Sequence, residues 1–188
     1  MKRALLALVL AALVAIGCDH KETNGGGPAV VDTELMAFLS EARSLHHQAD
    51  IKEDAGDLPG AISAIDRLVN AQRPHPDRPA PEVEEVLADA YARLAELRLK
   101  KGDLAPAGDA ITRGLEHAPG STYFRGHLLE VQGLVEKARS AELADAGKPG
   151  EAQKAREHAI QVLDEAIKIQ ADVIQRSLGK DGGTEAGR

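Results

Sequence analysis

The chain has 188 residues, a formal net charge of -7, 43% hydrophobic residues and only 2% aromatic residues. This hydrophobic content suits one globular domain and excludes a polytopic membrane protein. The negative charge argues against nucleic acid as a partner, because phosphate contacts need clustered Lys and Arg. A core poor in aromatics must use Leu, Ile, Val and Ala, which favours closely packed helices over sheets.

The first residues have the pattern of an export signal. Lys2 and Arg3 precede an unbroken apolar run of 13 residues, from Ala4 to Ile16. This run is shorter than the roughly 20 residues that a membrane-spanning helix needs. It has the length of the apolar region of a secretory signal, so residues 1–17 are predicted to be a signal peptide.

The apolar run ends in Ala15-Ile16-Gly17-Cys18 and is followed at once by polar residues. This ending resembles the lipobox of bacterial lipoproteins: an aliphatic residue, a small or aliphatic residue, Gly or Ala, then Cys. The resemblance implies cleavage before Cys18, diacylglycerol on its thiol and, usually, acylation of the new amino group. The lipid bilayer would then be a partner through Cys18, since two acyl chains are enough for stable anchoring. The alternatives are an uncleaved signal anchor and a secretory signal with a chance cysteine.

The lipoprotein resemblance also implies a location. It places the chain in a bacterial cell envelope, lipid-anchored and facing the periplasm or the cell exterior. Asp19 resembles the signal that retains lipoproteins in the inner membrane of enterobacteria, but other lineages differ, so the choice of membrane stays open. Residues 18–31 would form the lipidated cysteine and a flexible tether, because the stretch from Asn24 to Pro28 cannot hold regular structure.

Apolar residues recur at helical spacing from residue 32 onward, and no segment shows the alternation of a strand. An all-α domain is therefore predicted over residues 32–178, followed by a disordered tail over 179–188. The predicted helices cover residues 33–54, 59–72, 82–101, 104–117, 121–146 and 151–178. The stretch 73–81 holds four prolines and must be a linker.

Turn signals recur at a nearly fixed interval. Gly56-Asp57, Gly102-Asp103 and Gly147-Lys148 are separated by 46 and 45 residues, and each lies between a longer and a following helix. Such spacing is typical of a helical-hairpin array. Each hairpin would turn at its glycine, which allows a tight turn.

The residues around these turns resemble the tetratricopeptide repeat (TPR). That family has Gly-Asp or Gly-Asn in the turn, a small residue five positions later, a large apolar residue four further on, and often a final proline. The matching positions are Ala107, Ile111 and Pro119 after Gly102, Ala61 and Ile65 after Gly56, and Ala152 after Gly147. Arg156 departs from the pattern, and the interval exceeds the family's length of about 34 residues. The prediction is a short α-solenoid of about three TPR-like hairpins; a plain helical bundle is the alternative.

The TPR resemblance implies a function. Such arrays bind peptides or protein segments on the concave face formed by the first helix of each hairpin. That face would comprise Arg43, His46, Asp50, Glu53, Asp89, Ala92, Glu96 and Leu99. An acidic groove would prefer a basic or amphipathic partner. The alternative is that these residues are ordinary solvated surface.

No constellation in the sequence predicts catalysis, a cofactor or a metal. The only thiol belongs to Cys18, which lipid would consume, and no serine lies in a Gly-x-Ser-x-Gly elbow. No phosphate loop or dinucleotide fingerprint is present. His46 and Asp50 share a helix face, but two ligands are too few to hold an ion well. We expect a non-enzymatic scaffold that binds a protein or peptide, or else a structural lipoprotein that self-associates through its last two helices.

Overall fold

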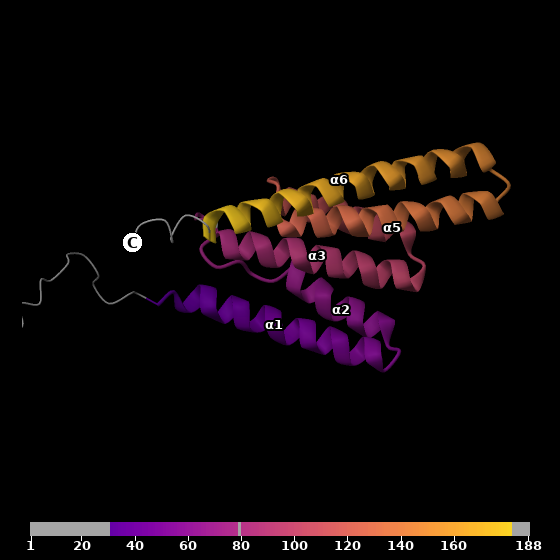
Figure 1. Ribbon diagram of the computed structural model, residues 1–188. Coiled ribbons are helices and arrows are strands. Elements are labelled where there is room, and N and C mark those ends of the chain that lie inside the picture. The colour runs from indigo at the N-terminus through magenta and orange to yellow at the C-terminus, as the bar shows by residue number, and fades with distance from the viewer. Residues whose placement is uncertain (1–30, 79, 182–188) are drawn as a thin grey trace, which may run out of the picture. The chain divides into compact units, whose positions relative to one another are not determined.

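The computed structural model describes residues 31–78 and 80–181 (Figure 1). The predicted signal peptide, Cys18 and nearly all of the predicted tether lie outside these residues, as does the end of the chain from residue 182. Residues from Asp32 onward form one compact unit, and the description below concerns that unit alone.

The described part of this unit is all-α, as predicted. Its helices are α1 (Thr33–Asp54), α2 (Leu58–Val69), α3 (Pro81–Lys101), α4 (Leu104–His117), α5 (Tyr123–Asp145) and α6 (Pro149–Asp181). No strand occurs in the ranges given above. The predicted bounds differ most at the end of α2, which stops at Val69, and at α6, which continues past the expected end at residue 178 through Asp181. None of these helices is long and apolar enough to cross a membrane.

The three predicted glycine turns are equivalent. Gly56, Gly102 and Gly147 have positive φ values of 77°, 90° and 73°. At the middle turn, the Gly102 N–H donates to the Leu99 carbonyl at 3.0 Å and the Asp103 N–H donates to the Arg98 carbonyl at 2.9 Å. This pair of bonds is a Schellman motif, and the same pair occurs at the other two turns. Glycine is required because the left-handed conformation costs other residues about 1–2 kcal/mol.

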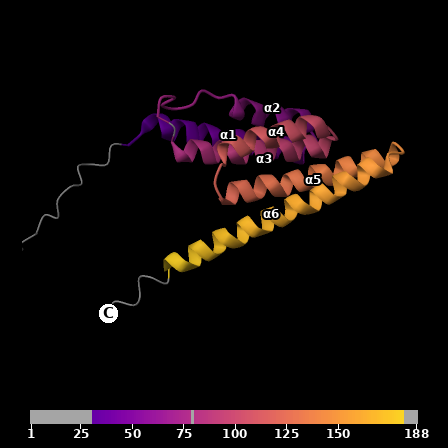
Figure 2. The same cartoon turned by 90° about the horizontal axis from the view of Figure 1, so that it is seen from above.

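The helices pack as three consecutive hairpins, α1–α2, α3–α4 and α5–α6. Each later hairpin contacts the one before it through its first helix: α3 packs on α1 and α2, and α5 packs on α3 and α4. Within the described residues, α6 packs only on α5, along whose outer side it runs (Figure 2). The first helices α1, α3 and α5 are therefore neighbours on one side of the array (Figure 1).

The proline-rich linker between α2 and α3 is tied back to the start of α1. Asp32 caps α1 by accepting from the Leu35 N–H at 3.0 Å. The His75 Nε2 lies 2.9 Å from both Asp32 carboxylate oxygens, and its Nδ1 lies 3.4 Å from Glu34. His75 holds this position with a φ of 46°. The linker predicted from its prolines thus has a defined path across the first hairpin.

Small residues set how closely the hairpins approach. A Cβ on Gly114 of α4 would lie 2.5 Å from Leu128 Cδ2 of α5 and 2.9 Å from Tyr91 Cβ of α3. A Cβ on Gly133 of α5 would likewise lie 2.5 Å from Leu163 Cγ of α6. Both contacts are too short for a real side chain, so each glycine permits a helix approach that alanine would prevent.

Two glycines of α4 provide a matched test of this packing. Gly114→Ala should destabilise the chain by about 1–3 kcal/mol, because the new methyl group overpacks the contact with α5. Gly108→Ala should stabilise it by about 0.5–1 kcal/mol, because a Cβ there meets nothing within 4 Å and alanine favours the helix. Urea unfolding of both variants measures these changes, and a stabilising Gly114→Ala would contradict the packing.

Candidate functional site

A groove of about 400 Å³ lies between α1 and α3 and reaches the start of α5. Its apolar lining consists of Leu39, Ala42, Val86 and Phe124. Its polar lining consists of Arg43, His46, Glu82, Glu85 and Asp89. The groove therefore combines an apolar floor with a rim on which three carboxylates outnumber one guanidinium.

The floor exists because α1 and α3 touch only lightly. α1 packs mainly on α2 and α3 mainly on α4, and α1 and α3 have few direct contacts with each other. Leu39 of α1 and Val86 of α3 pack against the core but stay partly exposed toward the groove. Phe124, in the first turn of α5, covers one side. The fold thus leaves apolar side chains unburied where the first helices diverge.

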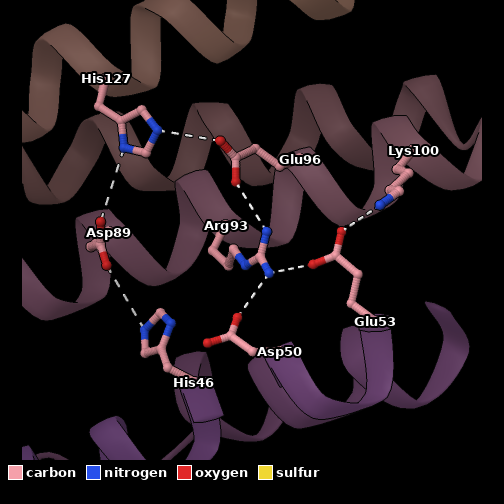
Figure 3. A network of polar contacts seen from close by, with 8 residues as sticks. All are labelled: His46, Asp50, Glu53, Asp89, Arg93, Glu96, Lys100 and His127. Carbon is pink, nitrogen blue, oxygen red and sulfur yellow. Dashed lines mark hydrogen bonds and ion pairs between the residues drawn. The ribbon is translucent and has the colours of Figure 1, made fainter. Parts of the chain in front are cut away.

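An ion-pair network adjoins the groove and joins α1 to α3 (Figure 3). Arg93 of α3 donates to Asp50 Oδ1 at 2.9 Å, to Glu53, and weakly to Glu96 at 3.5 Å. Lys100 donates to the second Glu53 oxygen at 2.8 Å. The Arg93 side chain is only 24% exposed, so its charge depends on these carboxylates for compensation.

The network fixes the charges of its members. The hydrogen bond from Lys100 is the main cause that lowers the pKa of Glu53, and Arg93 lowers it further although burial opposes them. Burial alone would lower the pKa of Arg93, but the surrounding carboxylates, Glu53 first, outweigh it and raise that pKa. Both groups therefore stay ionised, and α1 and α3 are held together by opposite charges in a partly water-excluded place.

A second set of contacts joins all three first helices through Asp89 (Figure 3). The Asp89 carboxylate on α3 lies 3.9 Å from His46 Nε2 on α1 and 4.0 Å from His127 Nδ1 on α5. The other ring nitrogen of His127 is hydrogen-bonded to Glu96 at 3.3 Å. The buried Nδ1 of His127 has no hydrogen-bond partner among the described residues, so Asp89 is the charge that faces it.

The pKa values of the two histidines shift in opposite directions, although Asp89 acts to raise both. The hydrogen bond to Glu96 raises the pKa of His127, with further contributions from Asp89 and Glu130. Burial lowers the pKa of His46 and outweighs the attraction of Asp89 and Asp50. The same His127–Glu96 bond lowers the pKa of Glu96. Near neutral pH the His127 side of Asp89 thus gains positive charge more readily than the His46 side.

The residues predicted for the partner-binding face take four kinds of position. Arg43, His46 and Asp89 line the groove. Asp50, Glu53 and Glu96 belong to the ion-pair network, where other side chains of the protein already bind them. Leu99 is half-buried against the core. Ala92 is wrong as a binding residue, because its side chain is 1% exposed and packs with Ala88, Ala118 and Leu128.

The prediction missed Arg93, Lys100 and His127 in the network, and the apolar floor of the groove. The spacing 86, 89, 93, 96, 100 follows one helix face in steps of three and four residues, which would have identified Arg93. The expected face stepped from Asp89 to Ala92 instead. Ala92 and Arg93 are one residue apart, and a step of one residue rotates a side chain by about 100° around a helix. Ala92 therefore points into the core, whereas Arg93 points toward α1.

Comparison with protein families, with curated proteins and with solved structures finds no match in any of the three.

Arg93 is expected to stabilise the contact between α1 and α3. Arg93→Met keeps most of the side-chain volume but leaves Asp50 without this partner and Glu53 with Lys100 alone. The loss should be about 1–2 kcal/mol, as for hydrogen bonds to charged groups that are partly exposed. Lys148→Met removes an exposed pair with Glu151 at 3.4 Å and should cost less than about 0.5 kcal/mol. Equal midpoints for the two variants in urea unfolding would contradict the role of Arg93.

The histidines should titrate in a defined order, measurable by NMR of their ring protons. His127 should titrate above its ordinary pKa of 6.5 and His46 below 6.5. Glu96→Gln should lower the pKa of His127, whereas Glu142→Gln, on an exposed part of α5, should not change it.

The sign of the linked stability change follows from these directions. Because the folded-state pKa of His127 is raised, its pair with Glu96 stabilises the fold below pH 6.5, and this stabilisation is lost as pH rises through the raised pKa. Wild type and Glu96→Gln should therefore converge in stability as the pH rises through that range. A gap that widens instead would contradict the assignment.

Proposed function

We propose that this protein is a lipid-anchored scaffold of a bacterial cell envelope, whose TPR-like hairpin array holds a basic, amphipathic segment of another protein in the groove between α1 and α3. Cys18 is the anchoring residue, and residues 18–31 connect it to the array. We assign the groove a binding role, because its lining combines apolar side chains with a charged rim.

The buried residues of each hairpin support a TPR-like array. The small and large positions of the TPR pattern, Ala61 and Ile65 in the first hairpin and Ala107 and Ile111 in the second, are all buried. In the third hairpin Ala152 is buried, but Arg156 is exposed. The packing of each first helix on both helices of the preceding hairpin is the order that a short solenoid requires.

The groove is the observation that carries the binding proposal. An amphipathic helix or extended segment can place apolar side chains on Leu39, Val86 and Phe124. Lys or Arg beside those side chains would meet Glu82, Glu85 and Asp89 on the rim. The carboxylates of the network are already paired and Asp89 faces two histidines, so Glu82 and Glu85 supply most of the charge that remains for a partner.

The anchor rests on the residues of the amino-terminal segment. A positive start, an apolar run and the sequence Ala15-Ile16-Gly17-Cys18 occur in the order that lipoprotein export requires. Asp19 favours the inner membrane. A diacylglyceryl group on Cys18 would hold the array at the bilayer through about 0.8 kcal/mol for each buried CH₂.

A peptide-display selection on the chain from residue 19 onward tests the groove. Enriched peptides should combine apolar residues at helical spacing with Lys or Arg. Their affinity should fall at least about tenfold in a Glu82→Lys, Glu85→Lys double variant, equivalent to about 1.4 kcal/mol. The matched control, Glu142→Lys with Asp145→Lys, reverses two exposed charges at the far end of α5 and should bind normally. Enrichment of acidic peptides, or equal loss in both variants, would refute the groove.

Cys18→Ser tests the anchor separately, in bacterial cells that carry the full chain. The wild-type chain should sediment with membranes and show the mass of added acyl chains. Without a thiol to accept diacylglycerol, the variant should lose both the added mass and the membrane association. Unchanged mass and fractionation would refute the anchor while leaving the groove proposal intact.

A further inference from the structure

Helix α6 carries a stripe of exposed apolar side chains, which we call the α6 stripe. Its members and their exposed fractions are Ile160 (56%), Ile167 (62%), Ile174 (58%) and Leu178 (64%). Exposed aliphatic residues are ordinary when scattered singly, but four that align on one face of a helix are typical of an interaction surface. The α6 stripe therefore requires an explanation outside the packing of the array.

Contact with α5 does not provide that explanation. α6 already buries a separate row against α5, which includes Ala159, Val162, Ala166 and Ile169. With 3.6 residues per turn, the α6 stripe lies roughly a third of a turn around the helix from that row. α6 thus has two apolar faces, and one of them is covered by α5, which runs beside α6 in Figure 2.

The spacing of the α6 stripe identifies its partner. Ile160 and Ile174 each lie seven residues from Ile167, one on either side. A helix turned end for end against this row presents the same residues in the same register, so that Ile167 meets its own copy and Ile160 meets Ile174. Seven-residue spacing is also the repeat that keeps two packed helices in contact along their length. From this self-complementary row we infer that α6 pairs with α6 of a second copy of this chain, in antiparallel orientation.

The charges beside the α6 stripe fit the same arrangement. Asp164 and Lys168 are both exposed and lie on the same flank, on either side of Ile167 along the helix. In a two-fold antiparallel pair, equal flanks face each other, which brings Asp164 of each copy toward Lys168 of the other. Glu157 and Gln175 lie on that flank as well, and Arg156 lies in line with the stripe, where it would face Leu178 of the other copy. Two copies therefore meet with opposite charges and little like-charge repulsion.

The same charges disfavour a lipid surface as the occupant. A helix that lies on a membrane carries Lys and Arg on its polar face. The exposed polar residues of α6 carry no such excess, because Asp164, Glu165 and Asp172 offset Lys168 and Arg176. The groove between α1 and α3 involves no residue of α6, so pairing through the α6 stripe leaves both grooves of a dimer open.

Sedimentation of the full chain, purified in mild detergent with micelles in large excess, tests this pairing. The wild-type chain should be a dimer at micromolar concentration. Ile167→Lys should raise its dissociation constant at least about 100-fold, because both copies lose a central apolar contact and gain a charge there. Ile174→Lys provides a second variant. Both sites are exposed, so circular dichroism should show unchanged helix content. Glu165→Gln changes the net charge equally on the other side of α6 and should leave the dimer intact.

Disulfide cross-linking in isolated membranes tests the register. The Ile167→Cys variant should form a disulfide-linked homodimer, because the two-fold axis passes near that position. The wild-type chain controls for Cys18, and Glu165→Cys controls for random collision; neither should cross-link efficiently. A monomeric wild-type chain in sedimentation overturns the proposal. So does a disulfide from position 167 to a different protein, which would assign the α6 stripe to another partner.

Discussion

The packing of α3 is the constraint on which the rest of the structure depends. α3 contacts α1, α2, α4 and α5, so most of its circumference is buried. Small residues such as Ala88, Ala92 and Ala95 permit this on α3 itself, and Gly114 permits it on α4. A helix covered by four neighbours has little surface left for polar residues. On the side of the first helices that surface is one strip, along which Asp89, Arg93, Glu96 and Lys100 succeed one another. The candidate site is thus formed by the part of the α3 surface that is not buried in the core.

On this side of α3, the beginning and the end of the helix have different roles because their neighbours differ. Toward the end of α3, Arg93 and Lys100 meet the carboxylates of α1, and these charges compensate each other within the protein. Toward its beginning, Glu82 and Glu85 line the groove beside Val86, and the only basic group that lines it with them besides His46 is Arg43. Internal pairing makes the end of α3, with Arg93 and Lys100, a structural contact with α1. The excess of negative charge beside exposed apolar side chains makes the beginning of α3, with Glu82 and Glu85, suited to bind a partner. Asp89 stands between them, with a histidine on each side.

The helices and their turns were predictable because their causes are local. The left-handed turns are predicted by Gly56, Gly102 and Gly147, and the extent of the linker is predicted by its prolines. The rotation of each helix was harder to predict, because it depends on how many neighbours cover it. Ala92 was assigned to the binding face through the TPR resemblance, whereas Leu128 of α5 covers it in the core. The floor of the groove was missed for the opposite reason: Leu39 and Val86 look like core residues, and only the light contact between α1 and α3 leaves them exposed.

The end of the array raises a problem that its beginning does not share. Within the described residues α6 packs on one neighbour only, and a polar outer face is what keeps such an outermost helix soluble. α6 departs from this rule with Ile160, Ile167 and Ile174, although Asp164, Lys168 and Asp172 between them show that polar residues are accommodated along the same stretch. A second copy solves the problem in the way the chain itself does at each earlier step, by packing another helix on the uncovered face. A dimer formed in this way would present two grooves and two lipid anchors. Each anchored dimer would then hold a partner with two binding segments more firmly than one groove could, because the second segment binds at a high effective concentration.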